Sequence, residues 1–131
     1  MKRCLLDSSF VIDFWNETAS RTFGPAHAWL RNNPSAELWI SPVTYAETLE
    51  GADDLVSARD LFRSYRWQLI GRQQGERAAL NQRRNASRLG ENDAWQLAIA
   101  ECMDASLVGH DSKAFSRLRD RYIDHRTPPP T

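Results

Sequence analysis

Residues 3–15, RCLLDSSFVIDFW, contain the turn that decides the fold. A short apolar run ends on Asp7, which predicts a buried strand with a carboxylate at its end. From Phe10 to Trp15 the apolar residues recur at helical spacing, so the next element is predicted to be an amphipathic helix. A strand that turns directly into a helix is typical of an α/β protein.

The rest of the chain repeats this alternation. The predicted strands cover residues 3–6, 38–40, 67–70, 106–109 and 122–123, and the predicted helices begin near residues 10, 25, 43, 55, 73, 93 and 112. Gly90 is expected to end the helix from Gln73 in a left-handed conformation. The helix from Asp93 has few polar residues and should be buried nearly all round. The sequence therefore predicts an α/β fold with a central, mostly parallel sheet of four to five strands, flanked by helices on both faces.

The composition predicts one compact cytoplasmic protein. The chain has 131 residues, 41% of them apolar, which suits a single domain over residues 1–126 followed by a proline-rich tail over residues 127–131. No apolar run is long enough to cross a bilayer and no signal peptide is evident, so we expect no membrane contact. Seventeen basic residues balance seventeen acidic ones, so bulk charge does not attract the protein to nucleic acid.

Four acidic residues are expected to meet at the carboxyl edge of the sheet, where ligands bind in open parallel sheets. Asp7 ends the first strand, and Glu47 lies early in the helix after the second strand. Asp93 heads the apolar helix, and Asp111 follows the fourth strand. Glu50 is an alternative to Glu47, but a helical rise of about 1.5 Å per residue places it farther from the strand end.

These acids form a candidate metal site. Carboxylates that share a partly buried site repel one another unless a cation compensates their charge. An all-oxygen site without well-placed His or Cys favours Mg²⁺ or Mn²⁺ over Zn²⁺. Such an ion ionises an attacking water and neutralises charge on a phosphodiester. Each acid also has a structural explanation, because Asp7, Asp93 and Asp111 suit helix N-termini and Glu47 suits a solvent-facing position.

The same residues lie in motifs that resemble the PIN domain, and specifically the VapC-like toxins of bacterial type II toxin–antitoxin systems. The resemblance covers nearly the whole chain. It rests on the order and spacing of residues 5–9 (LLDSS), 41–47 (SPVTYAE), 92–93 (ND) leading into 98–100 (AIA), and 109–111 (GHD) with Phe115.

This resemblance implies a PIN-like fold and a Mg²⁺- or Mn²⁺-dependent endoribonuclease that hydrolyses RNA phosphodiesters. Asp7, Glu47 and Asp93 would be its main catalytic and metal-binding acids. Asp111 would be the fourth acid, and Ser9 would be a polar residue that supports the site.

The chain departs from the family pattern near Asp111. Family members often carry Thr where this chain has Gly109, and an acid where it has Ala114. The departure leaves open whether Asp111 is a direct ligand and whether one or two metals bind.

The resemblance also implies partners. VapC-like proteins are usually neutralised by a small cognate antitoxin whose tail covers the active site, and they are expected to form homodimers. Lys113 and Arg117 are candidates for contacts with RNA phosphates. For Arg83, Arg84 and Arg88 on the polar helix, a solvated helix face is the favoured interpretation.

Other functions fit parts of the sequence. A non-catalytic PIN-like module that binds RNA or a partner is the main alternative, and the departure at Gly109 and Ala114 motivates it. A phosphatase of the haloacid dehalogenase type needs a second Asp two residues after the nucleophile, where this chain has Ser9. A response-regulator receiver needs an adjacent acidic pair that the first strand lacks.

Overall fold

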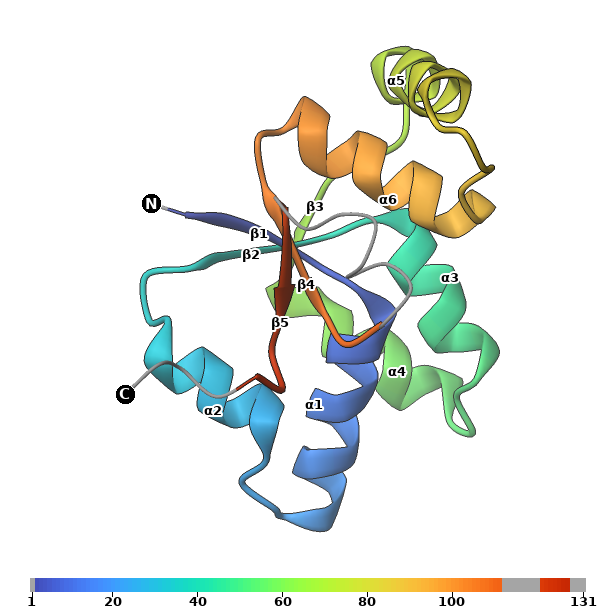
Figure 1. Ribbon diagram of the computed structural model, residues 1–131. Coiled ribbons are helices and arrows are strands. Elements are labelled where there is room, and N and C mark those ends of the chain that lie inside the picture. Colours follow the sequence, from blue (N-terminus) through green and yellow to red (C-terminus); the bar gives the residue numbers. More distant parts are fainter. Residues whose placement is uncertain (1, 112–120, 128–131) are drawn as a thin grey trace.

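The computed structural model describes residues 2–111 and 121–127. In chain order the elements are β1 (Arg3–Leu6), α1 (Ser8–Ser20), α2 (Pro25–Asn32), β2 (Glu37–Ile40), α3 (Pro42–Glu50), α4 (Leu55–Leu61), the 3₁₀ helix η1 (Phe62–Ser64), β3 (Arg66–Trp67), α5 (Arg72–Arg84), α6 (Glu91–Cys102), β4 (Ser106–Gly109) and β5 (Tyr122–Asp124) (Figure 1). None of the described helices is long and apolar enough to span a membrane.

The sheet has five strands, all parallel, in the order β3-β2-β1-β4-β5. This confirms the predicted α/β fold with its parallel sheet. The chain moves outward from β1 to β2 and β3, then crosses to the other side of β1 for β4 and β5. Ligand sites of such sheets lie at the carboxyl ends of the strands, where the strand order reverses. Asp7 is at this point, and its backbone N–H donates to the Val108 carbonyl at 2.8 Å.

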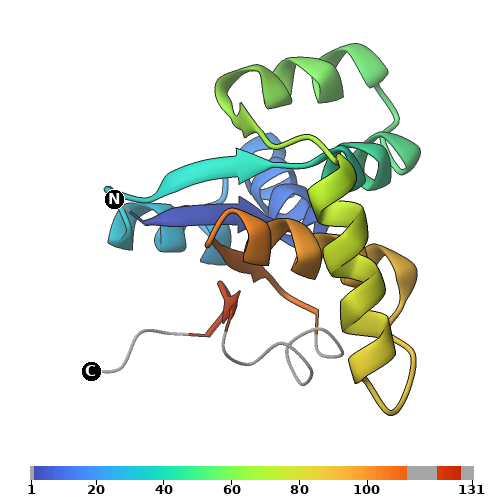
Figure 2. The same ribbon diagram turned by 90° about the horizontal axis from the view of Figure 1, so that it is seen from above.

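Helices cover both faces of the sheet, as expected (Figure 2). Successive residues of a strand point to opposite faces. Leu6 therefore packs in a cluster with residues of α1, α2 and η1, whereas Leu5 packs with Leu107 and Ile99 in a cluster with α6. Helix α5 packs on α6. β1 is therefore buried on both faces, and Asp7 follows its buried end.

Helix α5 ends earlier than predicted. It stops at Arg84, and Gly90 has a φ of −56° at the N-cap of α6, so the predicted left-handed helix stop is wrong. The side chain of Gln82 explains the difference. Its Oε1 accepts from the Leu89 N–H at 2.9 Å, and its Nε2 donates to the Leu89 carbonyl at 3.0 Å. These bonds hold residues 85–90 as a loop that leads directly into α6.

Strand β3 is shorter than the predicted 67–70. It comprises Arg66–Trp67, and one further bond runs from the Gln68 N–H to the Ile40 carbonyl at 2.9 Å. Leu69 and Ile70 are 65% and 37% exposed. The apolar run continues past the paired residues, so its length overestimates this edge strand.

The C-terminal third agrees with most of the predictions made for it. Helix α6 is buried along most of its length, and of its residues only Glu91 and Asn92 are exposed. The predicted edge strand at residues 122–123 is present as β5. The helix predicted from Ser112 to Leu118 lies outside the described residues.

Candidate functional site

Asp7 follows β1 at the switch point of the sheet. It occupies the N-cap position of α1, but its carboxylate makes no capping hydrogen bond to that helix. Instead, Asp7 Oδ2 accepts a hydrogen bond from Ser9 Oγ at 2.9 Å. The Ser8 backbone and the Gln96 side chain also contribute hydrogen bonds that act on the Asp7 carboxylate.

Ser9 links Asp7 to the end of β4. Besides donating to Asp7, Ser9 Oγ accepts a hydrogen bond from the backbone N–H of His110 at 2.7 Å. Gly109 permits this close approach, because an added Cβ would lie 2.7 Å from Ser9 Oγ and 2.8 Å from Asp7 Cβ. The predicted supporting residue Ser9 thus has a positioning contact with the predicted acid.

Glu47 lies beside the first turn of α6. Its Oε2 accepts a hydrogen bond from Asn92 Nδ2 at 3.2 Å, and Asp93 is the next residue of that turn. The negative charges of Asp7 and Asp93 both act on Glu47. Glu50, by contrast, is exposed to solvent. The structure therefore brings acids from β1, α3 and α6 to one region.

Burial is the main cause that raises the pKa values of both Asp7 and Glu47. Repulsion adds to it, because the charge of Asp111 acts on Asp7, and the charges of Asp7 and Asp93 act on Glu47. The hydrogen bonds that these two carboxylates accept do not outweigh burial and repulsion. When Asp7 and Glu47 are both ionised, the protein therefore does not fully compensate the negative charge at this site.

Glu17 shows how a structural carboxylate differs. It is 8% exposed, and it accepts hydrogen bonds from the backbone N–H groups of Gly24, Ala26 and His27 at 2.9–3.0 Å. His27 Nδ1 lies 2.7 Å from its Oε1. Burial raises the pKa of Glu17, but these hydrogen bonds together lower it below its usual value. Asp7 and Glu47 have pKa values shifted in the opposite direction, and such shifts are more frequent at functional sites than elsewhere.

A buried polar network joins the three elements that carry the acids. Gln96 Oε1 of α6 accepts from Ser41 Oγ at 2.6 Å, and Gln96 Nε2 donates to Thr44 Oγ1 at 2.7 Å. Thr44 Oγ1 donates in turn to the Leu6 carbonyl of β1 at 2.7 Å. Ser41 and Thr44 are 0% exposed and Gln96 is 3% exposed. Buried, satisfied polar groups of this kind fix the relative positions of the elements they connect.

The residues of this network were not among the predicted site residues, although the sequence carries signals for them. Thr44 precedes Glu47 by three residues and Gln96 follows Asp93 by three residues, so each pair lies on one face of its helix. Gln96 also interrupts an otherwise apolar run over residues 94–100. A lone amide in such a run indicates a buried polar contact.

The donor set suits a hard divalent cation. Among residues 2–111 and 121–127, no group of three or more His, Cys, Asp or Glu side chains is placed to hold a metal ion as it stands. The chemistry of the set nevertheless fits, because a cation would compensate buried carboxylates whose pKa values are raised. The residues that could hold it are Asp7, Glu47, Asp93 and Asp111. Lys113 and Arg117, the candidates for RNA contact, lie outside the described residues.

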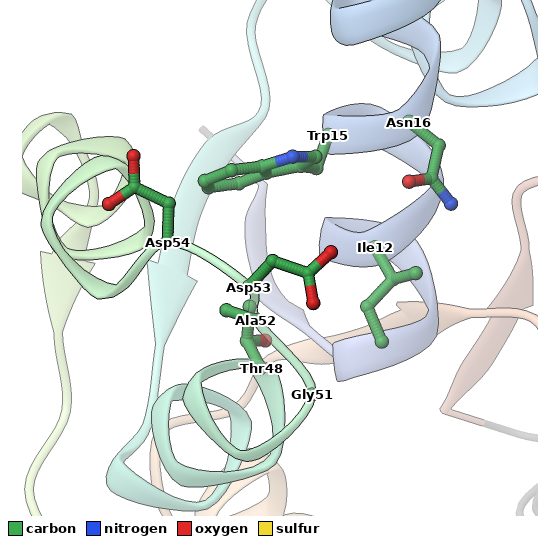
Figure 3. A pocket seen from close by; sticks show the side chains of 8 residues that line it. All are labelled: Ile12, Trp15, Asn16, Thr48, Gly51, Ala52, Asp53 and Asp54. Atoms are coloured by element: carbon green, nitrogen blue, oxygen red, sulfur yellow. The ribbon is translucent and has the colours of Figure 1, made fainter.

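A separate pocket of about 330 Å³ lies between α1 and the turn that joins α3 to α4 (Figure 3). Ile12 and Trp15 of α1 lie opposite Asp53 and Asp54 of the turn. None of the four predicted acids lines this pocket. Ile12 is 43% exposed, so the pocket presents an apolar wall to solvent.

Comparison with known proteins supports the same architecture. Residues 4–121 match the sequence model of the PIN domain family. A toxin–antitoxin complex from Klebsiella pneumoniae has a chain that is 21% identical, with a TM-score of 0.76 over 93% of this chain and 97% of that chain. VapBC-1 from nontypeable Haemophilus influenzae is 21% identical, with a TM-score of 0.70 over 95% of this chain and 99% of that chain.

VapBC2 from Rickettsia felis, bound to a DNA fragment from its promoter, is 17% identical, with a TM-score of 0.68 over 93% of this chain and 97% of that chain. At such identities the likeness concerns the fold. Among curated protein sequences, none matches this chain significantly.

Proposed function

The chain belongs to the PIN domain family, and we propose that it is a divalent-metal-dependent endoribonuclease, the toxin of a toxin–antitoxin pair. One observation carries the proposal. Asp7 and Glu47 come from separate elements, lie at the carboxyl edge of a parallel sheet and have raised pKa values caused by burial and repulsion. Proteins of the PIN family are typically nucleases, which agrees with such a site.

Asp7, Glu47 and Asp93 would hold Mg²⁺ or Mn²⁺, with Asp111 as the fourth acid. Bound there, the metal would supply an ionised water and stabilise negative charge on the phosphodiester. The fold would hold these carboxylates close together although they repel one another. Ser9 orients the Asp7 carboxylate through a 2.9 Å hydrogen bond, so its geometry is set before substrate arrives.

Cleavage of labelled single-stranded RNA by the purified protein tests this function. With Mn²⁺ we expect internal cuts, and with EDTA we expect none, because the carboxylates alone supply no nucleophile. Adding excess Mn²⁺ to the EDTA-treated protein should restore cleavage. RNA that binds but stays intact with either Mn²⁺ or Mg²⁺ would favour the non-catalytic PIN-like module instead.

A cognate antitoxin is the partner we propose, since the similar structure from Klebsiella pneumoniae is a toxin–antitoxin complex. The pocket beside α1 offers Ile12 and Trp15 as an apolar wall, with Asp53 and Asp54 at its rim. Such a surface suits an apolar side chain flanked by basic ones. A basic side chain from the antitoxin tail that reached the acids would replace the charge of the metal. A homodimer remains an expectation from the family resemblance, and a cytoplasmic location remains an expectation from the sequence.

The substitution Gln96→Leu tests whether the buried network positions the acids. We expect Mn²⁺ affinity and RNA cleavage to fall by about 10- to 100-fold, which is the usual effect of losing a group that orients metal ligands. Isothermal titration calorimetry with Mn²⁺ measures the affinity, and near-ultraviolet circular dichroism measures the fold.

Gln74→Leu is the matched control, because Gln74 is also buried, 8% exposed, and accepts from the Gly71 N–H at 2.9 Å on α5. We expect this control to lose stability but to keep its Mn²⁺ affinity. Equal Mn²⁺ affinities in the two folded variants would show that the network does not position the acids.

A further inference from the structure

An open groove of about 540 Å³ lies between α5 and α6. Its floor is formed by small residues of α5, among them Gly75 and Ala78, which recur on one face of the helix. Trp95 of α6 lies opposite, and a Cβ added at Gly75 would touch its ring at 3.9 Å. Because Gly75 and Ala78 have small or no side chains, the groove stays open beside the indole of Trp95.

The groove reaches the first turn of α6, the turn to which Asp93 belongs. Glu91 and Ala94 line the groove, and Asp93 itself does not. Figure 2 shows α5 crossing α6, with the loop of residues 85–90 leading from one helix to the start of the other. A chain lying in the groove would thus pass the first turn of α6.

Three charged residues line the groove. Arg83, Arg88 and Glu91 give it a net charge of +1, whereas the formal net charge of the protein is 0. Arg83 and Arg88 line the groove and are exposed. Arg88 Nη2 lies 3.5 Å from Glu91 Oε1, a surface pair with side chains 69% and 78% exposed. Such exposed pairs contribute little, so a phosphate can compete for the arginine.

We propose that this groove binds a single-stranded segment of RNA, with a base stacked on Trp95 and phosphates paired with Arg83 and Arg88. The inference rests on the proposed nuclease function, because it names where the substrate enters the site. Aromatic rings beside arginines are the usual way to hold single strands without reading their sequence. A second copy is the alternative occupant, and in that case altering the groove would change the oligomeric state.

Fluorescence anisotropy with a labelled single-stranded RNA, in EDTA so that no cleavage occurs, tests the groove. The surface variant Arg83→Gln/Arg88→Gln should weaken binding by about tenfold and lower the slope of log affinity against log salt by about 1.4, or about 0.7 per phosphate contact. Trp95→Leu should weaken binding at least about fivefold, as expected for a lost stacking contact.

The control is Arg59→Gln/Arg63→Gln on α4 and η1, which removes the same charge, including an exposed pair between Arg63 and Asp60. We expect the control to keep the salt dependence of the wild-type protein. Equal losses in the groove and control variants would overturn the proposal, as would a change of oligomeric state in place of weaker RNA binding.

The proposed nuclease function and the proposed RNA-binding groove can be refuted independently. Binding that depends on the groove but is not followed by cleavage in Mn²⁺ would refute the nuclease and leave the groove standing. Cleavage in Mn²⁺ with unchanged affinity in the groove variants would refute the groove alone.

Discussion

The substitution Asp7→Asn is expected to abolish Mn²⁺-dependent RNA cleavage, with a loss of at least about 10³-fold. Losing a group that merely orients a metal ligand costs about 10- to 100-fold, and losing a direct ligand removes charge as well as geometry. Asparagine preserves the shape of the side chain, and its Oδ1 can accept the hydrogen bond that Ser9 donates to Asp7 at 2.9 Å. Rates of RNA cleavage at saturating Mn²⁺ measure the effect.

The same substitution should not destabilise the protein without metal. Burial raises the pKa of Asp7, so the folded state disfavours its charged form. The stability that this group contributes is present below its unfolded pKa and is lost as pH rises through its folded pKa. At neutral pH the wild-type protein therefore has a free-energy cost for ionising the buried Asp7 carboxyl, and the Asp7→Asn variant would lack this cost. Thermal unfolding in EDTA should show an equal or higher midpoint for the variant.

Asp13→Asn is the matched control, and Asp13 lies on α1, the helix that follows Asp7. Hydrogen bonds from Arg126 are the main cause that lowers the pKa of Asp13, and His125 Nε2 lies 2.7 Å from its Oδ2. A lowered pKa contributes stability above the unfolded pKa, so this control should lower the midpoint at neutral pH. Cleavage that survives in Asp7→Asn, or a midpoint lowered as much as in the control, would contradict the assignment of Asp7.

The parallel sheet was predictable because local patterns encode it. Apolar runs alternate with helical spacing along the chain, and Pro25 and Pro42 mark the first residues of α2 and α3. The error at the end of α5 comes from a side-chain contact that the hydrophobic pattern does not show. Gln82 closes the loop after α5 by bonding to Leu89, seven residues away, and Gly90 therefore caps α6 from outside instead of stopping α5.

The positions of Asp7 and Asp93 in the fold were predictable for a related reason, since Asp7 follows β1 and Asp93 lies in the first turn of α6. Their role as metal ligands stays a prediction. The residues that hold them were harder to find. Thr44 and Gln96 are separated by 52 positions, and their hydrogen bond depends on α3 and α6 lying side by side. A sequence shows the polar residue in an apolar run, but only the packing shows its partner.

The substitution Gly109→Thr has the second large effect that we expect. For this substitution the structure and the family resemblance predict different results. Threonine is frequent at this position in the family, so the resemblance alone predicts a tolerated change. In this chain a Cβ at residue 109 would lie 2.6 Å from Tyr122 Oη, 2.7 Å from Ser9 Oγ and 2.8 Å from Asp7 Cβ. Each separation is shorter than a van der Waals contact, so the three neighbours must move.

We expect Gly109→Thr to lower the free energy of unfolding by about 1–3 kcal/mol, as overpacking usually does. Cleavage should fall by about 10²-fold, because Ser9 and Asp7 shift together and a displacement of about 1 Å has that effect on catalysis. Urea unfolding and RNA cleavage measure the two losses. Gly51→Ala is the control, since a Cβ there has no atom within 4 Å, and it should change neither quantity. A stable and active Gly109→Thr variant would mean that β4 does not hold Asp7 in place, and Ser9 would then have no positioning role.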